Sequence, residues 1–172
     1  MSNRLLLLVK SKPWLLPFLY HLPEGAFSPS QLARELGTRT DYVKHCLRIV
    51  RRLNLVKHVG GGLYAASREE IKGVLETLGV IKLRSMLVAD LGDQYAIIRA
   101  RRKYVKVARV SRELVERVAV ILAQLRRARA SEIAERVGHT GREVYRALLV
   151  LRAYGRVVKQ GDHYTSVDSA EL

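Results

Sequence analysis

The sequence predicts a mainly α fold with small β-hairpins, arranged as two related domains that are joined by a helical and basic linker region. Two observations lead to this fold class. A pattern of apolar residues occurs twice along the chain, and in each copy helical spacing gives way to short strand-like stretches around a glycine turn. The length of 172 residues suffices for two small domains, each with a modest core.

The repeat becomes visible when residue 30 is shifted onto residue 131, which aligns residues 30–37 with 131–138. The positions that match are mostly apolar, and these are the positions that a packed unit needs to keep. A long repeat seen only twice indicates two related domains rather than a solenoid. We therefore predict domains over residues 1–66 and 111–172, with connecting helices and a basic segment over 67–110.

The first copy begins with a strongly apolar helix over residues 14–22, which Pro17 should kink or delay. Ser28 is expected to cap a second helix that ends at Gly37, because a serine followed three residues later by Gln31 forms a capping box. A third helix is expected over residues 39–53. Two short strands around Gly60, Gly61 and Gly62 complete the copy as a hairpin.

The second copy repeats this order. Ser111 should cap a helix over residues 112–125, and a second helix over 131–137 should end at Gly138. The box Thr140–Glu143 should open the third helix, and a hairpin follows over residues 156–165.

The remaining segments are expected to be as follows. Leu5–Val9 is too short to span a membrane and is expected to be a packing or dimerisation element. A capping box at Ser67–Glu70 should open an amphipathic helix that ends at Gly79. Residues 81–91 are expected to form another helix, and residues 95–110 a basic strand or hairpin.

Helix, helix, glycine turn, helix and hairpin is the order of elements in a winged helix-turn-helix domain. Residues 31–37 and 132–138 resemble the second helix and turn of winged-helix transcription regulators, and residues 141–148 resemble their recognition helix. The resemblance covers about residues 14–66 and 112–167. It implies a tandem winged helix-turn-helix protein in which the third helix of each copy enters the major groove of DNA and the hairpins act as wings.

The charge agrees with such a partner. Lysine and arginine total 31 against 16 aspartate and glutamate, which gives a net charge of +15. An excess of this size favours a polyanionic partner, of which nucleic acid is the commonest, although anionic membranes and acidic proteins also qualify. The composition, rich in arginine and valine and poor in asparagine, is typical of a thermophile.

The candidate DNA-binding residues lie on the third helices, on the wings and in the central basic segment, where arginine, lysine, tyrosine and threonine can reach base edges or phosphates. Leu149 and Glu143 are also expected on the exposed face of the second recognition helix, where Leu149 would pack against a partner. The predicted DNA-binding set is Arg39, Thr40, Tyr42, Lys44, His45, Arg48, Arg51, Arg52, Lys57, His58, Arg99, Arg101, Arg102, Lys103, Lys106, Arg142, Tyr145, Arg146, Arg152 and Lys159.

Enzymatic and metal-binding functions are not expected. The three glycines are not followed by the Lys-Ser/Thr of a phosphate-binding P-loop, and the five histidines are scattered without ligand spacing. Cys46, the only cysteine, falls on the apolar stripe of its helix and is expected to be a core residue. We therefore predict no catalytic residue, no metal, no cofactor and no membrane association, and a cytoplasmic, nucleoid-associated protein.

Three functions stay open on the sequence. The first is double-stranded DNA binding, sequence-specific or architectural, by a transcriptional regulator or a chromatin-type protein that could act as a homodimer. The second is a protein–protein adaptor, since tandem winged helices resemble the kleisin-associated subunits of condensin-like complexes and subunits of general transcription factors; its partner would act in transcription or chromosome organisation. The third is binding of single-stranded DNA or RNA through the central basic segment, which Tyr95 and Tyr104 flank.

Overall fold

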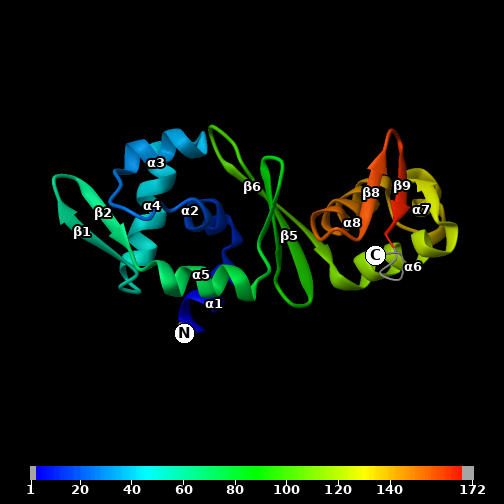
Figure 1. The fold of residues 1–172 in the computed structure, drawn as a ribbon, viewed down its shortest axis with the longest axis horizontal. Coiled ribbons are helices and arrows are strands. Elements are labelled where there is room, and N and C mark those ends of the chain that lie inside the picture. Colours follow the sequence, from blue (N-terminus) through cyan, green and yellow to red (C-terminus); the bar gives the residue numbers. More distant parts are fainter. Residues whose placement is uncertain (1–2, 168–172) are drawn as a thin grey trace. The chain divides into compact units, whose positions relative to one another are not determined.

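The computed structural model describes residues 3–167 (Figure 1). It overturns the predicted fold class, because the protein combines α and β structure instead of being mainly α with small hairpins. Among the described residues, strands make up 26% beside 50% helix, and they form sheets of two, four and three strands. The difference arises mainly in the segment that was expected to be a linker.

The chain forms two compact units, each assembled from segments that are not contiguous in sequence. The first unit contains the chain up to Val80 together with Arg84–Leu87 and Ile98–Val107. The second contains Ile81–Leu83, Val88–Ile97 and the chain from Ala108 onward. Both units therefore include parts of the central segment.

The first unit contains short helices, a hairpin and one further helix. Their bounds are α1 (Asn3–Ser11), the 3-10 turn η1 (Pro13–Leu15), α2 (Leu16–Tyr20), α3 (Pro29–Leu36), α4 (Thr40–Arg51), β1 (Val56–Gly60), β2 (Leu63–Ala66) and α5 (Arg68–Thr77).

Local sequence signals explain most of these boundaries. The Ser28 hydroxyl accepts a hydrogen bond from the Gln31 amide at 3.2 Å, as the capping box predicted. Gly37 ends α3 in the left-handed conformation, with φ of 71°. The prolines divide the expected helix over residues 14–22 into η1 and α2, since Pro17 lacks an amide proton and occupies the first turn of α2. Leu5 and Val9 of α1 are buried, which fits the packing role expected for that run.

The segment after α5 is a four-stranded meander in which consecutive strands are neighbours. Its strands are β3 (Ile81–Leu83), β4 (Met86–Asp90), β5 (Gln94–Ala100) and β6 (Val105–Ser111). The hairpin expected over residues 95–110 is confirmed, whereas the helix expected over residues 81–91 is wrong. Residues 86–89 are all buried, so their apolar run belongs to a strand covered on both faces, which periodicity does not distinguish from a buried helix. The helix after Ser67 is confirmed, but Ser67 makes no side-chain cap.

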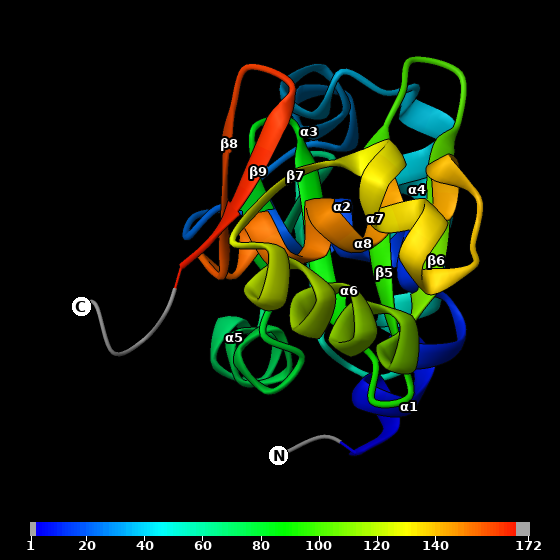
Figure 2. The ribbon, with the colours of Figure 1, turned by 90° about the vertical axis from the view of Figure 1, so that its right-hand side faces the viewer.

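In the second unit, three helices lie beside a three-stranded sheet (Figure 2). The elements are α6 (Arg112–Leu125), β7 (Arg127–Arg129), α7 (Ala130–Val137), α8 (Gly141–Ala153), β8 (Val157–Gln160) and β9 (His163–Ser166). Ser111 and Thr140 cap α6 and α8 as predicted, each accepting a backbone amide hydrogen bond. Strand β7 was not predicted, because three residues are too few to show a pattern.

Strand pairing repeats in the two units and reflects their sequence repeat. In the first unit Phe27 forms an isolated bridge with Tyr64, and in the second Ala128 of β7 pairs with Tyr164 of β9. The hairpins differ at their tips. The register of β1 and β2 shifts between His58 and Gly60, so the first hairpin contains a bulge that the pairing of β8 with β9 lacks.

Candidate nucleic-acid interface

Helix α4 presents a row of basic side chains to solvent because its apolar stripe is fully used by the core. Its buried residues are Val43, Cys46, Leu47 and Val50, spaced three to four apart. The rest of the helix then carries the polar positions together with the half-buried Ile49. The side chains exposed there are Lys44, His45, Arg48 and Arg51, and exposed Arg39 and Arg52 stand at the two ends of the helix.

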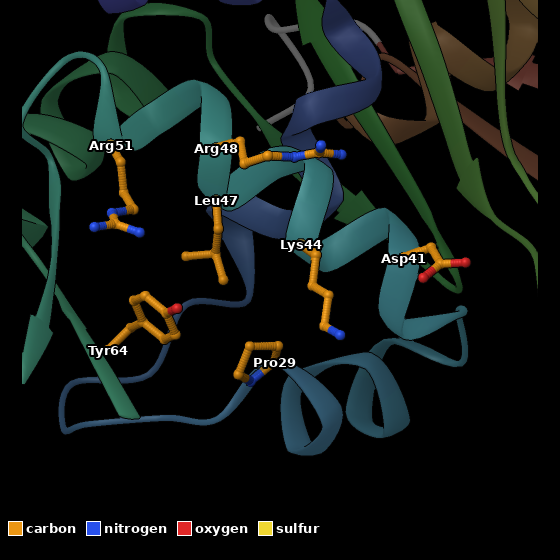
Figure 3. A pocket seen from close by; sticks show the side chains of 7 residues that line it. All are labelled: Pro29, Asp41, Lys44, Leu47, Arg48, Arg51 and Tyr64. Carbon is orange, nitrogen blue, oxygen red and sulfur yellow. The ribbon is translucent and has the colours of Figure 1, made fainter. Parts of the chain in front are cut away.

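A cleft of about 430 Å³ runs along this helix (Figure 3). Lys44, Arg48 and Arg51 contribute its cations, and Asp41 is its one acidic residue. Tyr64 of β2 closes one end, with the Arg51 guanidinium carbon 5.8 Å from the centroid of its ring. This distance is within cation–π range, so the Arg51 side chain is held over the hairpin.

The β1–β2 hairpin continues the basic surface from the end of the cleft. Lys57 and His58 are exposed on β1, and the His58 and Tyr64 rings contact edge-on with centroids 5.1 Å apart. Helix α4 and this hairpin therefore present cations on adjoining elements of the same unit.

A second cleft, of about 700 Å³, opens at the beginning of α4. Arg39 and Thr40 line it from the helix, and Arg102 and Lys103 reach it from the loop between β5 and β6. The sequence did not predict this meeting of residues that are some sixty positions apart. No side chain caps α4, whose N-cap position is occupied by Arg39, so the positive end of the helix faces this cleft together with the two loop cations. Asp41, in the first turn of α4, also lines the cleft and is its one acidic residue.

The other predicted residues of the basic segment lie on the same hairpin. Arg101 and Lys106 are exposed and Arg99 is partly exposed. Tyr104 is 60% exposed beside them. The Arg101 amide donates to the Tyr104 carbonyl at 2.8 Å, which fixes the loop that carries Arg102 and Lys103.

Two predicted residues of α4 have roles inside the fold. The Tyr42 hydroxyl donates a hydrogen bond to the Trp14 carbonyl at 2.5 Å, and burial raises the pKa of this phenol above its ordinary value. The His45 ring stacks on the Trp14 indole with centroids 5.2 Å apart. The Tyr42 hydroxyl thus uses its one proton in the hydrogen bond to the Trp14 carbonyl oxygen.

The corresponding helix of the second unit is far less accessible. In α8 the side chains of Leu149 and Val150 are buried along with the expected stripe, so the expectation that Leu149 is exposed to a partner is wrong. Strand β3 contacts α8, and Tyr95 of β5 packs against Tyr154 just beyond the helix, with centroids 5.9 Å apart.

What remains exposed on the predicted surface of the second unit is small. Arg142 and Tyr145 are exposed in the first turns of α8, whereas Arg146 and Arg152 are half-buried. Lys159 is exposed on β8, with its ammonium 5.8 Å from the centroid of the Tyr164 ring.

The two units also differ in whether their basic side chains form ion pairs with carboxylates. In the described part of the chain, none of the cations on α4, on the β1–β2 hairpin or in the β5–β6 loop forms an ion pair with a carboxylate, and all the pairs lie in the second unit. Those pairs are Arg112–Asp90, Arg129–Asp162, His163–Asp162, Arg156–Glu116 and His139–Glu143.

The pairing has electrostatic consequences. The Arg156 guanidinium hydrogen-bonds the Glu116 carboxylate at 3.0 Å and lowers the pKa of that carboxyl group. The named cations of the first unit therefore keep their charge without an ion pair in residues 3–167, while part of the positive charge of the second unit is neutralised within the fold.

No protein-family model and no curated protein matches the sequence. Among solved structures, the chain is similar to the mRNA-binding domain of elongation factor SelB from E. coli in complex with SECIS RNA. The identity is 11%, over 97% of this chain and 100% of that chain, with a TM-score of 0.31. A likeness at this TM-score carries no argument about function.

Membrane-spanning helices and clusters of metal-ligating side chains are both absent from residues 3–167. No helix there has the length and apolar character needed to cross a membrane. No group of three or more histidine, cysteine, aspartate or glutamate side chains is placed to hold a metal ion in the same residues.

Proposed function

We propose that this protein binds double-stranded DNA through its first unit, with α4 as the recognition helix of a winged helix-turn-helix. The observation that carries the proposal is the row of cations on α4, Lys44, Arg48 and Arg51, which line one cleft with Tyr64 and form no ion pair with a carboxylate of residues 3–167. A second cleft joins Arg39, at the N-cap of α4, to the β5–β6 loop. Sequence-specific regulation and chromatin-type compaction are both compatible with this mode of binding.

The dimensions and chemistry of the surface support a duplex. The major groove is about 12 Å wide and admits one α-helix. Arginine can hydrogen-bond both O6 and N7 of guanine, and lysine neutralises phosphates as a point charge. Arg48 and Arg51 lie one turn apart on α4, so one inserted helix would offer both to the same groove.

The β5–β6 loop would add contacts to the phosphate backbone. Arg102 and Lys103 reach the beginning of α4, where a phosphate would also meet the positive end of the helix dipole. Each neutralised phosphate releases condensed counterions, which strengthens binding at low salt without regard to sequence.

A second candidate function is binding of single-stranded DNA or RNA. The exposed Tyr104 ring favours it, because an exposed aromatic among cations can stack on an unpaired base. This candidate differs from the first in its prediction, since it requires preference for a single strand and dependence on Tyr104.

The test is binding of the whole protein to a random-sequence duplex and to a matched single strand over a salt series, measured by fluorescence anisotropy. Duplex binding predicts a log–log salt slope of about −0.9 per phosphate contacted, hence a magnitude of roughly 5 or more for an interface of this kind. The Arg48→Ala/Arg51→Ala variant should reduce that magnitude by about 1 to 2.

The matched control is Arg127→Ala/Arg136→Ala, which removes the same charge from exposed positions of the second unit. It should leave the slope close to that of the wild type. Equal effects of the two variants would show that only net charge matters, and absence of duplex binding at low salt would overturn the proposal.

A further inference from the structure

The tip of the β1–β2 hairpin is an exposed apolar projection. Val59 is 54% exposed and Leu63 is 38% exposed, and between them stand Gly60, Gly61 and Gly62. No polar side chain therefore occurs over these five residues. The bulge between β1 and β2 falls at Val59, so the tip contains one more residue than a regular pairing would give it.

The three glycines make this projection thin. All three have positive φ, at 96°, 60° and 74°, a conformation that glycine adopts without strain. A Cβ added at any of them would meet no atom within 4 Å, so packing within the protein does not require glycine at these positions. The result is a backbone turn flanked by two aliphatic side chains.

The corresponding tip of the second unit has the opposite character. It carries Gln160, Gly161 and Asp162, and the Asp162 carboxylate pairs with Arg129 at 3.2 Å and with His163 at 2.7 Å. That tip is polar and tied to its own sheet. The apolar tip is therefore a property of the first unit and is not a requirement of the hairpin.

Charge indicates what the apolar tip meets. Lys57 and His58 are exposed on the strand that leads to it, and Arg51 stands over Tyr64, which pairs with His58 next to the tip. The aliphatic side chains of the tip are flanked by cations. A partner that binds them must therefore offer an apolar surface bordered by negative charge. A DNA groove does so, because stacked base pairs lie between two rows of phosphates.

We propose that the tip of the first hairpin is a wedge, and that Val59 and Leu63 enter the minor groove of duplex DNA and bend it by partly unstacking a base step. This inference rests on the proposed function and adds a mode of contact to it. The minor groove is only about 6 Å wide, which a glycine turn without side chains can enter. Aliphatic wedges of this kind kink duplexes by roughly 20–90°.

The experiment uses the full chain with a duplex of about 25 base pairs that carries a donor and an acceptor dye at its ends. Energy transfer reports the bend, and anisotropy in the same sample reports affinity. The wild type should shorten the end-to-end distance. The Val59→Ser/Leu63→Ser variant should abolish the bend and weaken binding roughly five- to tenfold, because it removes apolar contact. The salt slope should stay unchanged, because no cation is lost.

The matched control is Val158→Ser, which changes a 45% exposed valine on the second hairpin and should leave both the bend and the affinity as in the wild type. Tight, salt-dependent binding without a bend, or a bend that survives Val59→Ser/Leu63→Ser, would overturn the wedge while leaving the cationic interface intact. Absence of duplex binding would overturn both proposals. Tip-dependent sedimentation with anionic phospholipid vesicles, without bending of DNA, would assign the tip to a membrane instead and would also overturn the wedge.

Discussion

The side chains of α4 divide between those that are exposed to solvent and those that are bound within the fold. The buried stripe of α4 left Lys44, Arg48 and Arg51 exposed, as the spacing predicted. Tyr42 was assigned to the same exposed set, yet its hydroxyl is directed at Trp14. A tyrosine at the border between the buried and exposed faces of a helix can belong to either face, because its ring is apolar and its hydroxyl is polar.

The role of Tyr42 can be tested by Tyr42→Phe, which removes the hydroxyl and leaves the Trp14 carbonyl without this donor. We expect the free energy of unfolding to fall by about 1 kcal/mol in urea denaturation, with duplex affinity unchanged. Tyr104→Phe is the control, because that ring is 60% exposed, and its stability should equal that of the wild type. If the Tyr42→Phe protein were as stable as the wild type but bound DNA more weakly, Tyr42 would belong to the DNA interface.

At the scale of elements, end signals predicted helices better than apolar runs did. Ser28, Ser111 and Thr140 each accept the expected amide hydrogen bond. In contrast, the run over residues 86–89 indicated a helix and forms strand β4, in which residues on both faces are buried. A run of this length fits a buried helix and a buried strand equally, and only pairing with β3 and β5 decides between them.

The caps provide a matched pair of variants. Thr140→Ala should lower the free energy of unfolding by about 1 kcal/mol, because the Glu143 amide, which donates to the Thr140 hydroxyl at 3.2 Å, loses its acceptor. Ser67→Ala should have little effect, since Ser67 makes no side-chain cap despite standing at the beginning of α5 within a similar motif. Urea denaturation followed by circular dichroism measures both, and equal losses would contradict the assigned caps.

At the scale of the whole molecule, two units with a common order of elements carry their charge differently. The cations of α4 and of the β5–β6 loop have no carboxylate partners within residues 3–167, whereas Arg129 and Arg156 of the second unit are paired. The helix α8 is also covered along its later turns. On the proposed function, we therefore expect the first unit to supply most of the affinity for DNA.

This division predicts unequal effects of two charge-matched variants. Arg102→Ala/Lys103→Ala, in the loop that reaches the beginning of α4, should reduce the magnitude of the salt slope by about 1 to 2. Arg142→Ala/Arg146→Ala, on α8, should change it by less than about 1. A larger effect of the α8 pair, measured by anisotropy over the same salt series, would assign the main interface to the second unit.

The sequence by itself determined the repeat, the capped helices, the glycine turns and the exposed cations of α4, because each depends on residues that are close along the chain. It also located Arg102 and Lys103 in a basic hairpin. Only the tertiary structure decided that this hairpin belongs to a four-stranded sheet, that its loop meets the beginning of α4, and that α8 is covered. These features arise from contacts between segments that are distant in sequence, and the local periodicity of a chain does not indicate which distant segments it contacts.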